Sequence, residues 1–314
     1  MIDLQNIPAL KKLLSQYDQV SYLRGQIIPT INLKPQINHH SRFIQFIVKK
    51  KNVSSILKIH WWKDIADSKF QTELYIYNDL LKRNPHLKEH MPSLIHFSIH
   101  NLEYLELELL IDYIPLGDSN SLSKVPDIDL ITKLIKIMRN FHIPKKDLID
   151  THHALEETRN YKWYIEEVKK IDRIIANNKI LKSFYPSSSI NDIIEKNKNR
   201  FLVTKYLVLN DRNPSNVLIN NSKIKILDFD KSGLSNPAID YTFLYCLLLE
   251  NDKLASIYLK ILEKTYNKFS YFWEIFWLDT LFKLTGLIFY WEKNDQVKST
   301  FYKKQFDRIL KFQV

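Results

Sequence analysis

The sequence predicts an α+β protein in which an antiparallel sheet is followed by a mainly helical part. Two observations lead to this fold class. Before residue 113, β-branched and partly alternating runs are separated by turn residues, which is typical of strands. From residue 127 onward, apolar residues recur mostly at helical spacing. At 314 residues the chain is long enough for one two-lobed enzyme or for two modest domains.

The N-terminal part contains the predicted strands. Residues 7–17 have the pattern of a short amphipathic helix, and a second helix is expected over residues 68–81. The three lysines at 49–51 lie where a turn is expected, between two of the strands. Strands are predicted at residues 27–33, 43–48, 54–60, 92–97 and 102–113.

The C-terminal part contains most of the predicted helices. One runs over residues 129–142 and is ended by Pro144. A strand at 206–209 and a hairpin of residues 217–219 and 224–227 interrupt the helical pattern. The other helices are expected at residues 151–177, 180–198, 241–249, 254–266, 269–293 and 301–312.

Composition limits the class of protein. An aromatic content of 13% and a hydrophobic content of 45% argue against disorder. The net charge of +11 comes from lysines spread through the chain, so we do not expect a nucleic-acid partner, although a basic surface could attract a nucleotide. A single cysteine, Cys246, excludes an internal disulfide. Without a signal-peptide pattern or a membrane-length apolar run, we expect a cytoplasmic protein with no membrane partner.

The residues with the clearest chemistry lie between positions 207 and 240. Asp211 is followed five residues later by Asn216, then by the predicted hairpin, then by Asp228-Phe-Asp230. Phosphoryl transfer needs a carboxylate that takes the proton of the attacking hydroxyl and oxygen ligands that hold Mg²⁺ against the phosphates. This stretch offers both. The alternative is that these residues only form turns, as isolated Asp and Asn often do.

The same motif resembles a known family. Asp-x-x-x-x-Asn, a short hairpin and Asp-Phe-Asp are similar to the catalytic and metal loops of protein-kinase-like enzymes. The continuation KSGLSNPAID, which ends at Asp240, resembles the aminoglycoside phosphotransferase and choline kinase branch. No Ala-Pro-Glu segment of the protein-kinase type follows. The resemblance implies a two-lobed protein-kinase-like fold, with a nucleotide-binding lobe of residues 1–113 and a helical lobe of residues 114–314.

The resemblance also implies roles for individual residues. Asp211 would orient and deprotonate an acceptor hydroxyl, and Asn216 and Asp228 would bind Mg²⁺. Lys58, on the third predicted strand, would hold the phosphates of ATP or GTP. Glu73, on the following helix, would position Lys58.

Further nucleotide contacts are expected from the resemblance at two places. The segment LLIDYIPLG resembles the hinge between lobes, so the backbone of Ile111 to Tyr113 would contact the adenine. The loop expected to cover the phosphates contains no glycine, and Asn38 or a nearby side chain would contact them instead.

The chain also departs from the family pattern. The family usually has His-Gly before the catalytic Asp, whereas this chain has Leu209 and Asn210. Arg212 after the Asp is unusual and could pair with an acidic substrate or with a neighbouring carboxylate. Asp230 could add a carboxylate near the second metal position or simply face solvent. Asp240 is expected to be a helix N-cap and a brace for the catalytic loop.

The sequence leaves the acceptor and the exact activity open. The resemblance implies a Mg²⁺-dependent small-molecule kinase that transfers phosphate from ATP or GTP to a hydroxyl of an aminoglycoside, choline or sugar-like acceptor. Aromatic and acidic residues of the helical insertion, such as Trp163 and Glu166, could bind a cationic acceptor or belong to the core and surface of a helix. His142 is expected to be structural. A protein Ser/Thr kinase and a catalytically weak kinase-like binding module are the alternatives.

Overall fold

The computed structural model describes most of the chain. The described residues are 12–22, 43–61, 72–100, 104–110, 114–118, 120–122, 125–148, 155–176, 184–202, 205–210, 213–220, 223–269 and 271–313. Among these residues, no helix combines the length and the apolar character needed to cross a bilayer.

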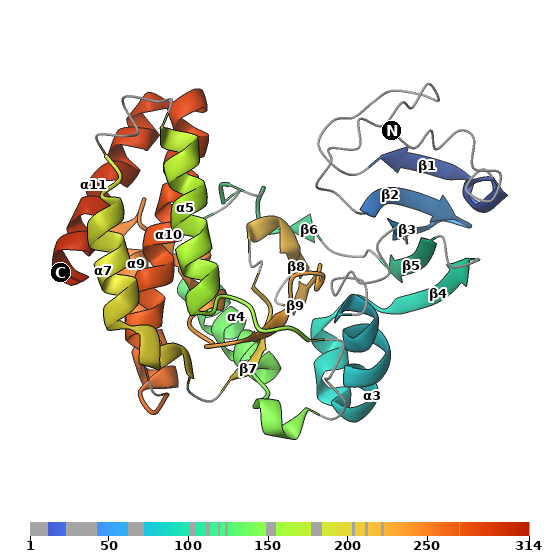
Figure 1. The fold of residues 1–314 in the computed structure, drawn as a ribbon. Coiled ribbons are helices and arrows are strands. Elements are labelled where there is room, and N and C mark those ends of the chain that lie inside the picture. Colours follow the sequence, from blue (N-terminus) through green and yellow to red (C-terminus); the bar gives the residue numbers. More distant parts are fainter. Residues whose placement is uncertain are drawn as a thin grey trace.

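The N-terminal lobe is an antiparallel sheet with the order β1-β2-β3-β5-β4 (Figure 1). β2 and β3 form a hairpin whose turn residues, Lys51 and Asn52, both have positive φ, as a tight two-residue turn requires. β3 is the central strand, so both of its edges are paired. The strands are β1 (Gln19–Tyr22), β2 (Phe43–Lys50), β3 (Val53–Trp61), β4 (Leu94–His100) and β5 (Tyr104–Leu110).

One helical segment, residues 72–83, lies between β3 and β4 in the chain. It contains a π-helical stretch, η2 (Tyr75–Leu80), and ends with α3 (Leu81–Arg83). Tyr75, Ile76 and Leu80 are buried, so this segment is attached to the core along one side. A 3-10 helix, η3 (Pro85–His90), continues towards β4.

The C-terminal lobe is mostly helical (Figure 1). A short sheet with the order β6-β8-β9 and a two-stranded pair, β7 and β10, lie among its helices. The strands are β6 (Ile114–Pro115), β7 (Tyr206–Val208), β8 (Val217–Asn220), β9 (Lys223–Ile226) and β10 (Gly233–Ser235). The helices are α4 (Ile128–Phe141), α5 (Tyr161–Ile175), α7 (Ser187–Lys196), α8 (Ile239–Leu248), α9 (Asp252–Tyr266), α10 (Phe272–Asn294) and α11 (Gln296–Gln313), with short 3-10 turns η4 (Lys145–Asp147), η5 (Lys198–Leu202) and η6 (Pro214–Asn216).

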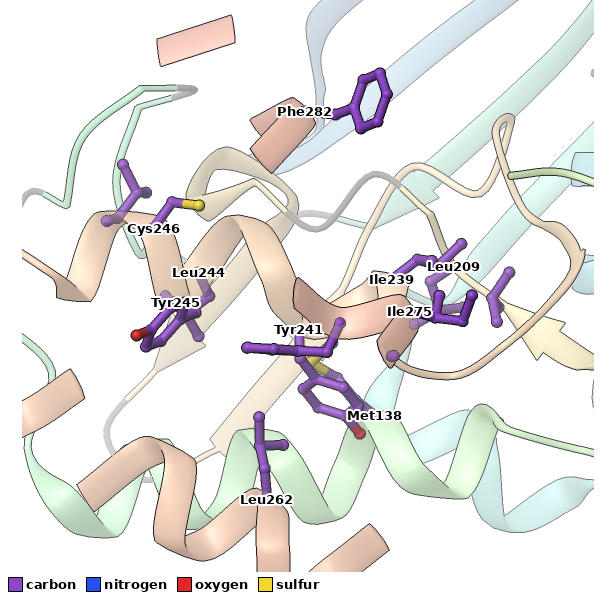
Figure 2. Packing of buried hydrophobic residues seen from close by; sticks show 14 of the residues in the cluster. Met138, Leu209, Ile239, Tyr241, Leu244, Tyr245, Cys246, Leu262, Ile275 and Phe282 are labelled. Atoms are coloured by element: carbon purple, nitrogen blue, oxygen red, sulfur yellow. The ribbon is translucent and has the colours of Figure 1, made fainter. Parts of the chain in front are cut away.

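The core of this lobe is built around α8 and α10. Both helices are apolar on nearly all sides, as expected for helices enclosed by others. Figure 2 shows side chains of this core, including Met138, Tyr241, Leu262 and Ile275, which come from α4, α8, α9 and α10. Leu209, in the loop after β7, belongs to the same core and is fully buried.

The predicted fold class is confirmed, and some elements need correction. β1 and β10 were not predicted, because runs of four and three residues are too short for a periodic pattern. The helix predicted at 151–177 begins only at Tyr161, after the N-cap Asn160. The predicted strand at 27–33 and residues 7–11 of the first predicted helix lie outside the described residues, as does the lobe boundary at residues 111–113.

Candidate active site

A buried lysine joins the two lobes at the centre of the candidate site. Lys58 of β3 is 1% exposed, and its Nζ lies 2.6 Å from Glu73 Oε2 and 2.6 Å from Asp228 Oδ1. Glu73 lies in the helical segment of the N-terminal lobe, and Asp228 follows β9 in the C-terminal lobe. Lys58 and Asp228 are 170 positions apart in the chain, so this cluster of one cation and two carboxylates joins distant segments.

The electrostatics of this cluster keep the lysine charged. Burial alone would lower the pKa of Lys58, but Asp228 and Glu73 outweigh burial and raise the pKa above its usual value. An ammonium group is the form that can contact the phosphates of a nucleotide.

The backbone brings Asn216 next to Asp228. The Leu227 amide donates a hydrogen bond to the Asn216 carbonyl at 2.9 Å. The side chains of Asn216 and Asp228 are almost fully buried. Asp228 has a φ of 65°, a left-handed conformation that is uncommon for a residue other than glycine and is often found at functional sites.

The donor set fits a divalent cation such as Mg²⁺. Carboxylate and amide oxygens are the hard ligands that Mg²⁺ prefers, with the remaining ligands supplied by phosphates and water. In addition, Asp230 Oδ1 is buried and accepts no hydrogen bond from any described residue. Within the described part of the chain, no three His, Cys, Asp or Glu side chains are grouped to hold a metal ion by themselves.

Asp230 lies in a strongly perturbed environment. Burial, followed by the charge of Asp228, raises the pKa of Asp230 to about 7. A positive charge next to this carboxylate would favour its ionised form.

Asn210, the residue before Asp211, is fixed by its backbone conformation and by its side-chain hydrogen bonds. Asn210 has a φ of 61°, in the left-handed region. Its side chain donates to Thr158 Oγ1 at 2.9 Å and to the Lys231 carbonyl at 3.2 Å, and it accepts from Arg159 Nε at 3.2 Å. Asparagine thus adopts the conformation for which glycine is the usual residue and adds hydrogen bonds that glycine lacks.

Asp240 fixes the same loop from the C-terminal core. Its carboxylate accepts from the Leu209 amide at 2.8 Å and from the Asn210 amide at 2.5 Å. His142, at the end of α4, places Nε2 2.9 Å from Asp240 Oδ2 and Nδ1 2.7 Å from the Tyr266 hydroxyl. Asp240 lies within the first turn of α8, whose N-cap is Ala238, so the expected N-cap role is wrong.

A row of aromatic rings supports Phe229 between the two acidic residues. Phe229 is fully buried, stacks on Phe141 of α4 with ring centroids 5.9 Å apart, and meets Tyr77 edge to face at 5.5 Å. Such contacts add about 0.5–1.5 kcal/mol per pair beyond the burial of area. The rings link the N-terminal helical segment, the Asp228 segment and α4.

Arg159 is a residue near the site that the sequence motifs did not indicate. This residue lies in the non-helical stretch before α5, where the Glu156 carbonyl accepts from the Leu234 amide at 2.8 Å. Its guanidinium lies 3.6 Å from the ring centroid of Trp163, and its Nε is 3.7 Å from the buried Asp279. The only local signal was the helix-capping Asn160, which predicts that a helix begins after it.

Several predicted site residues lie outside the described residues. They are Asp211, Arg212, Ile111, Tyr113 and Asn38. The flanking residues Asn210 and Asn213 are described, so the structure places the ends of the loop that contains Asp211.

Comparison with known proteins supports the fold. No protein-family model matches the chain, and no curated protein sequence matches it either. Solved structures do match. The chain is similar to aminoglycoside phosphotransferase APH(4)-Ia, with 10% identity and a TM-score of 0.58 over 96% of this chain and 97% of that one.

Two ligand complexes are also similar. A mutant of APH(4)-Ia in a ternary complex with ADP and hygromycin B gives a TM-score of 0.55 at 10% identity, covering 96% of this chain and 97% of the other. The GDP and kanamycin complex of APH(2″)-IIIa gives a TM-score of 0.58 at 12% identity, covering 98% of each chain.

The molecule therefore has a protein-kinase-like fold, with a lysine, a glutamate and an aspartate joined between its lobes. Within that class, its fold is that of the aminoglycoside phosphotransferases, as the sequence resemblance implied.

Proposed function

We propose that this protein is a small-molecule kinase that transfers the γ-phosphate of ATP or GTP to a hydroxyl group. The observation that carries the proposal is the buried contact of Lys58 with both Glu73 and Asp228. In a phosphotransferase fold, this arrangement presents one cation to phosphates and one carboxylate to their metal ion.

In the proposed reaction, the acceptor oxygen attacks the γ-phosphorus and the bond to the bridging oxygen of the β-phosphate breaks. Asp211 orients the hydroxyl and takes its proton, and the nucleoside diphosphate leaves. Lys58 holds the phosphates, and Glu73 keeps its flexible side chain in place. Alignment of the two reactants supplies much of the acceleration.

Asn216 and Asp228 would hold Mg²⁺, which neutralises the negative charge of the phosphates when it is bound. The backbone hydrogen bond between Leu227 and Asn216 keeps these two ligands adjacent. Asp230, whose pKa is raised in the structure, lies two residues further on and would add negative charge beside the metal.

We propose an acceptor of the aminoglycoside, choline or sugar type. The support is the similarity to enzymes whose structures contain hygromycin B or kanamycin. The backbone of Ile111 to Tyr113 is proposed to contact the nucleotide base, and Asn38 and Arg212 are proposed to contact phosphate or acceptor.

A phosphorylation assay tests this function. The purified protein is incubated with Mg²⁺ and γ-labelled ATP or GTP and a panel of aminoglycosides, amino alcohols and sugars. We expect one class of acceptor to become labelled. Asp211→Asn should lower turnover by about 10²- to 10⁴-fold, because a general base is lost, while binding of the nucleotide persists.

The matched control is Asp307→Asn, which makes the same chemical change at an exposed residue of α11 and should leave turnover unchanged. Binding is followed by the melting temperature with Mg²⁺ and nucleotide. Unchanged turnover in Asp211→Asn would refute the role of this residue. Absence of any thermal shift at millimolar nucleotide would instead favour a kinase-like binding module.

A further inference from the structure

A basic cavity lies away from the candidate active-site residues. Its volume is about 730 Å³, within the range of small-molecule sites. None of the described residues that line it belongs to the candidate active site. Five lysines line it, contributed by three segments of the chain: Lys88, Lys133, Lys136, Lys223 and Lys225. We refer to it as the lysine cavity.

The three segments are packed together, so the lysines converge. Lys133 and Lys136 are one turn apart on α4 and therefore share a face of that helix. Lys223 and Lys225 are two residues apart on β9 and point to the same side of the strand. η3 contributes Lys88 and contacts both β9 and α4.

The charge of four of these five lysines is not neutralised by a carboxylate of the described residues. Among the described residues, Lys88, Lys133, Lys136 and Lys223 form no ion pair with a carboxylate. Among the described residues of the lining, Glu89 is the only acidic one, and it lies 3.3 Å from His90. Elsewhere on the surface, lysines such as Lys298 and Lys303 do contact glutamates.

One lysine is largely buried in the wall. Lys225 is only 9% exposed, and long charged side chains are rarely buried to this degree. Burial also lowers the pKa of the neighbouring His90, which hydrogen-bonds to the backbone of Ile224, so the charged form of this imidazole is disfavoured. The positive charge in the lysine cavity thus comes from lysines, and a polyanion would relieve their mutual repulsion.

We propose that the lysine cavity binds a small anion that carries several phosphate groups. The basic lining is confined to one hollow of about 730 Å³, whereas a nucleic-acid backbone would need an extended basic surface, so a small molecule is favoured. Several lysines spread over three segments suit several phosphates better than one, because each phosphate can contact a different segment.

Calorimetric titration with inorganic tripolyphosphate tests the proposal. Lys133→Gln/Lys136→Gln removes two charges on an exposed face of α4. We expect the affinity to fall by about tenfold or more, since each lysine contributes a modest amount. Single inorganic phosphate should bind at least about tenfold more weakly than tripolyphosphate to the wild type.

The matched control is Lys260→Gln/Lys264→Gln, which removes two charges from exposed positions of α9 and should bind as the wild type does. Tripolyphosphate bound at the candidate active site would not respond to either variant, so the comparison isolates the cavity. Circular dichroism and melting temperature establish that each variant is folded.

Equal affinity of all three proteins for tripolyphosphate would overturn the proposal, and so would equal affinity for single phosphate. A single-stranded RNA oligonucleotide is titrated in parallel. If RNA binds in a manner that needs Lys133 and Lys136 while tripolyphosphate does not, the ligand is a nucleic-acid backbone and the proposal of a small ligand is wrong.

Discussion

Leu209 and Asn210 occupy the positions at which the resembling family usually has His-Gly. The buried Leu209 side chain anchors the loop in the apolar core, and Asn210 supplies the left-handed backbone. An imidazole still contacts Asp240, whose carboxylate holds this loop, because His142 lies at the end of α4. Leu209 and Asn210 thus hold the backbone of this loop in the conformation seen here.

The role of Asn210 leads to a prediction for two variants. Asn210→Gly and Asn210→Ala both remove the same side-chain hydrogen bonds, but only alanine is strained at a φ of 61°. We expect Asn210→Ala to be less stable than Asn210→Gly by about 1 kcal/mol. Urea unfolding of the two variants measures this difference.

The comparison of the two variants contains its own control, since the lost hydrogen bonds cancel. Equal stability would mean that the loop relaxes to a negative φ in the alanine variant. In that case the left-handed conformation would not be imposed by the Asp240 carboxylate on the two backbone amides.

Sequence spacing was informative for residues with a local motif. Asn216 and Asp228 flank a hairpin, so their separation in the sequence already places them at one end of it. Contacts such as His142 with Asp240 join residues 98 positions apart and leave no periodic pattern. Arg159 was missed for the same reason, because its partners Asn210 and Asp279 are distant in the chain.

At the scale of elements, helices with a strong apolar period were predictable. The helix predicted over residues 129–142 corresponds to α4, which ends at Phe141 just before Pro144. Where a helix is apolar on nearly every face, as α10 is, its ends are set by capping residues. Asp295 ends α10, and its carboxylate accepts from the Val297 and Lys298 amides at the start of α11.

A charged network also joins α10 to α11. Glu292 accepts hydrogen bonds from Lys303 at 2.8 Å and from Ser299 at 2.5 Å, and its side chain is only 12% exposed. These two bonds, with Lys303 the larger cause, lower the pKa of Glu292 below its usual value.

This shift predicts a pH-dependent effect of Glu292→Gln. Because the folded-state pKa is lower than the unfolded-state pKa, the glutamate stabilises the fold above the unfolded value of about 4.3 and stops doing so as pH falls through the folded value. We expect the variant to lose about 0.5–1 kcal/mol at pH 7. Urea unfolding of both proteins at several pH values measures the difference.

The expected loss should shrink as the pH approaches the folded-state value. Lys303→Met is the second variant of a double-mutant cycle, because the charge of Lys303 faces the Glu292 carboxylate. A difference between Glu292→Gln and the wild type that stays constant as the pH falls would contradict an ionic origin and would point to altered packing between the helices.

At the scale of the whole molecule, the described residues near the candidate site connect the lobes through two kinds of contact. One is the ion pair of Lys58 with Asp228, and the other is the row of Tyr77, Phe229 and Phe141. In Figure 1 the N-terminal sheet lies apart from the long C-terminal helices, which depend on their own core. Loss of the ion pair should therefore affect the two lobes unequally.

Lys58→Met tests this coupling between the lobes. The substitution leaves Glu73 and Asp228 as buried carboxylates without their shared cation, a change that typically costs about 3–5 kcal/mol. We expect amide hydrogen exchange to quicken in β2 and β3, while amides of α8 and α10 stay protected, because local openings follow local stability.

Lys82→Met, at an exposed residue of the same lobe, should leave both sets unchanged. Lys58→Arg keeps a cation and should fall between the wild type and Lys58→Met. Equal acceleration of exchange in both lobes would mean that the molecule unfolds as one cooperative unit and that the ion pair does not set the stability of the N-terminal lobe alone.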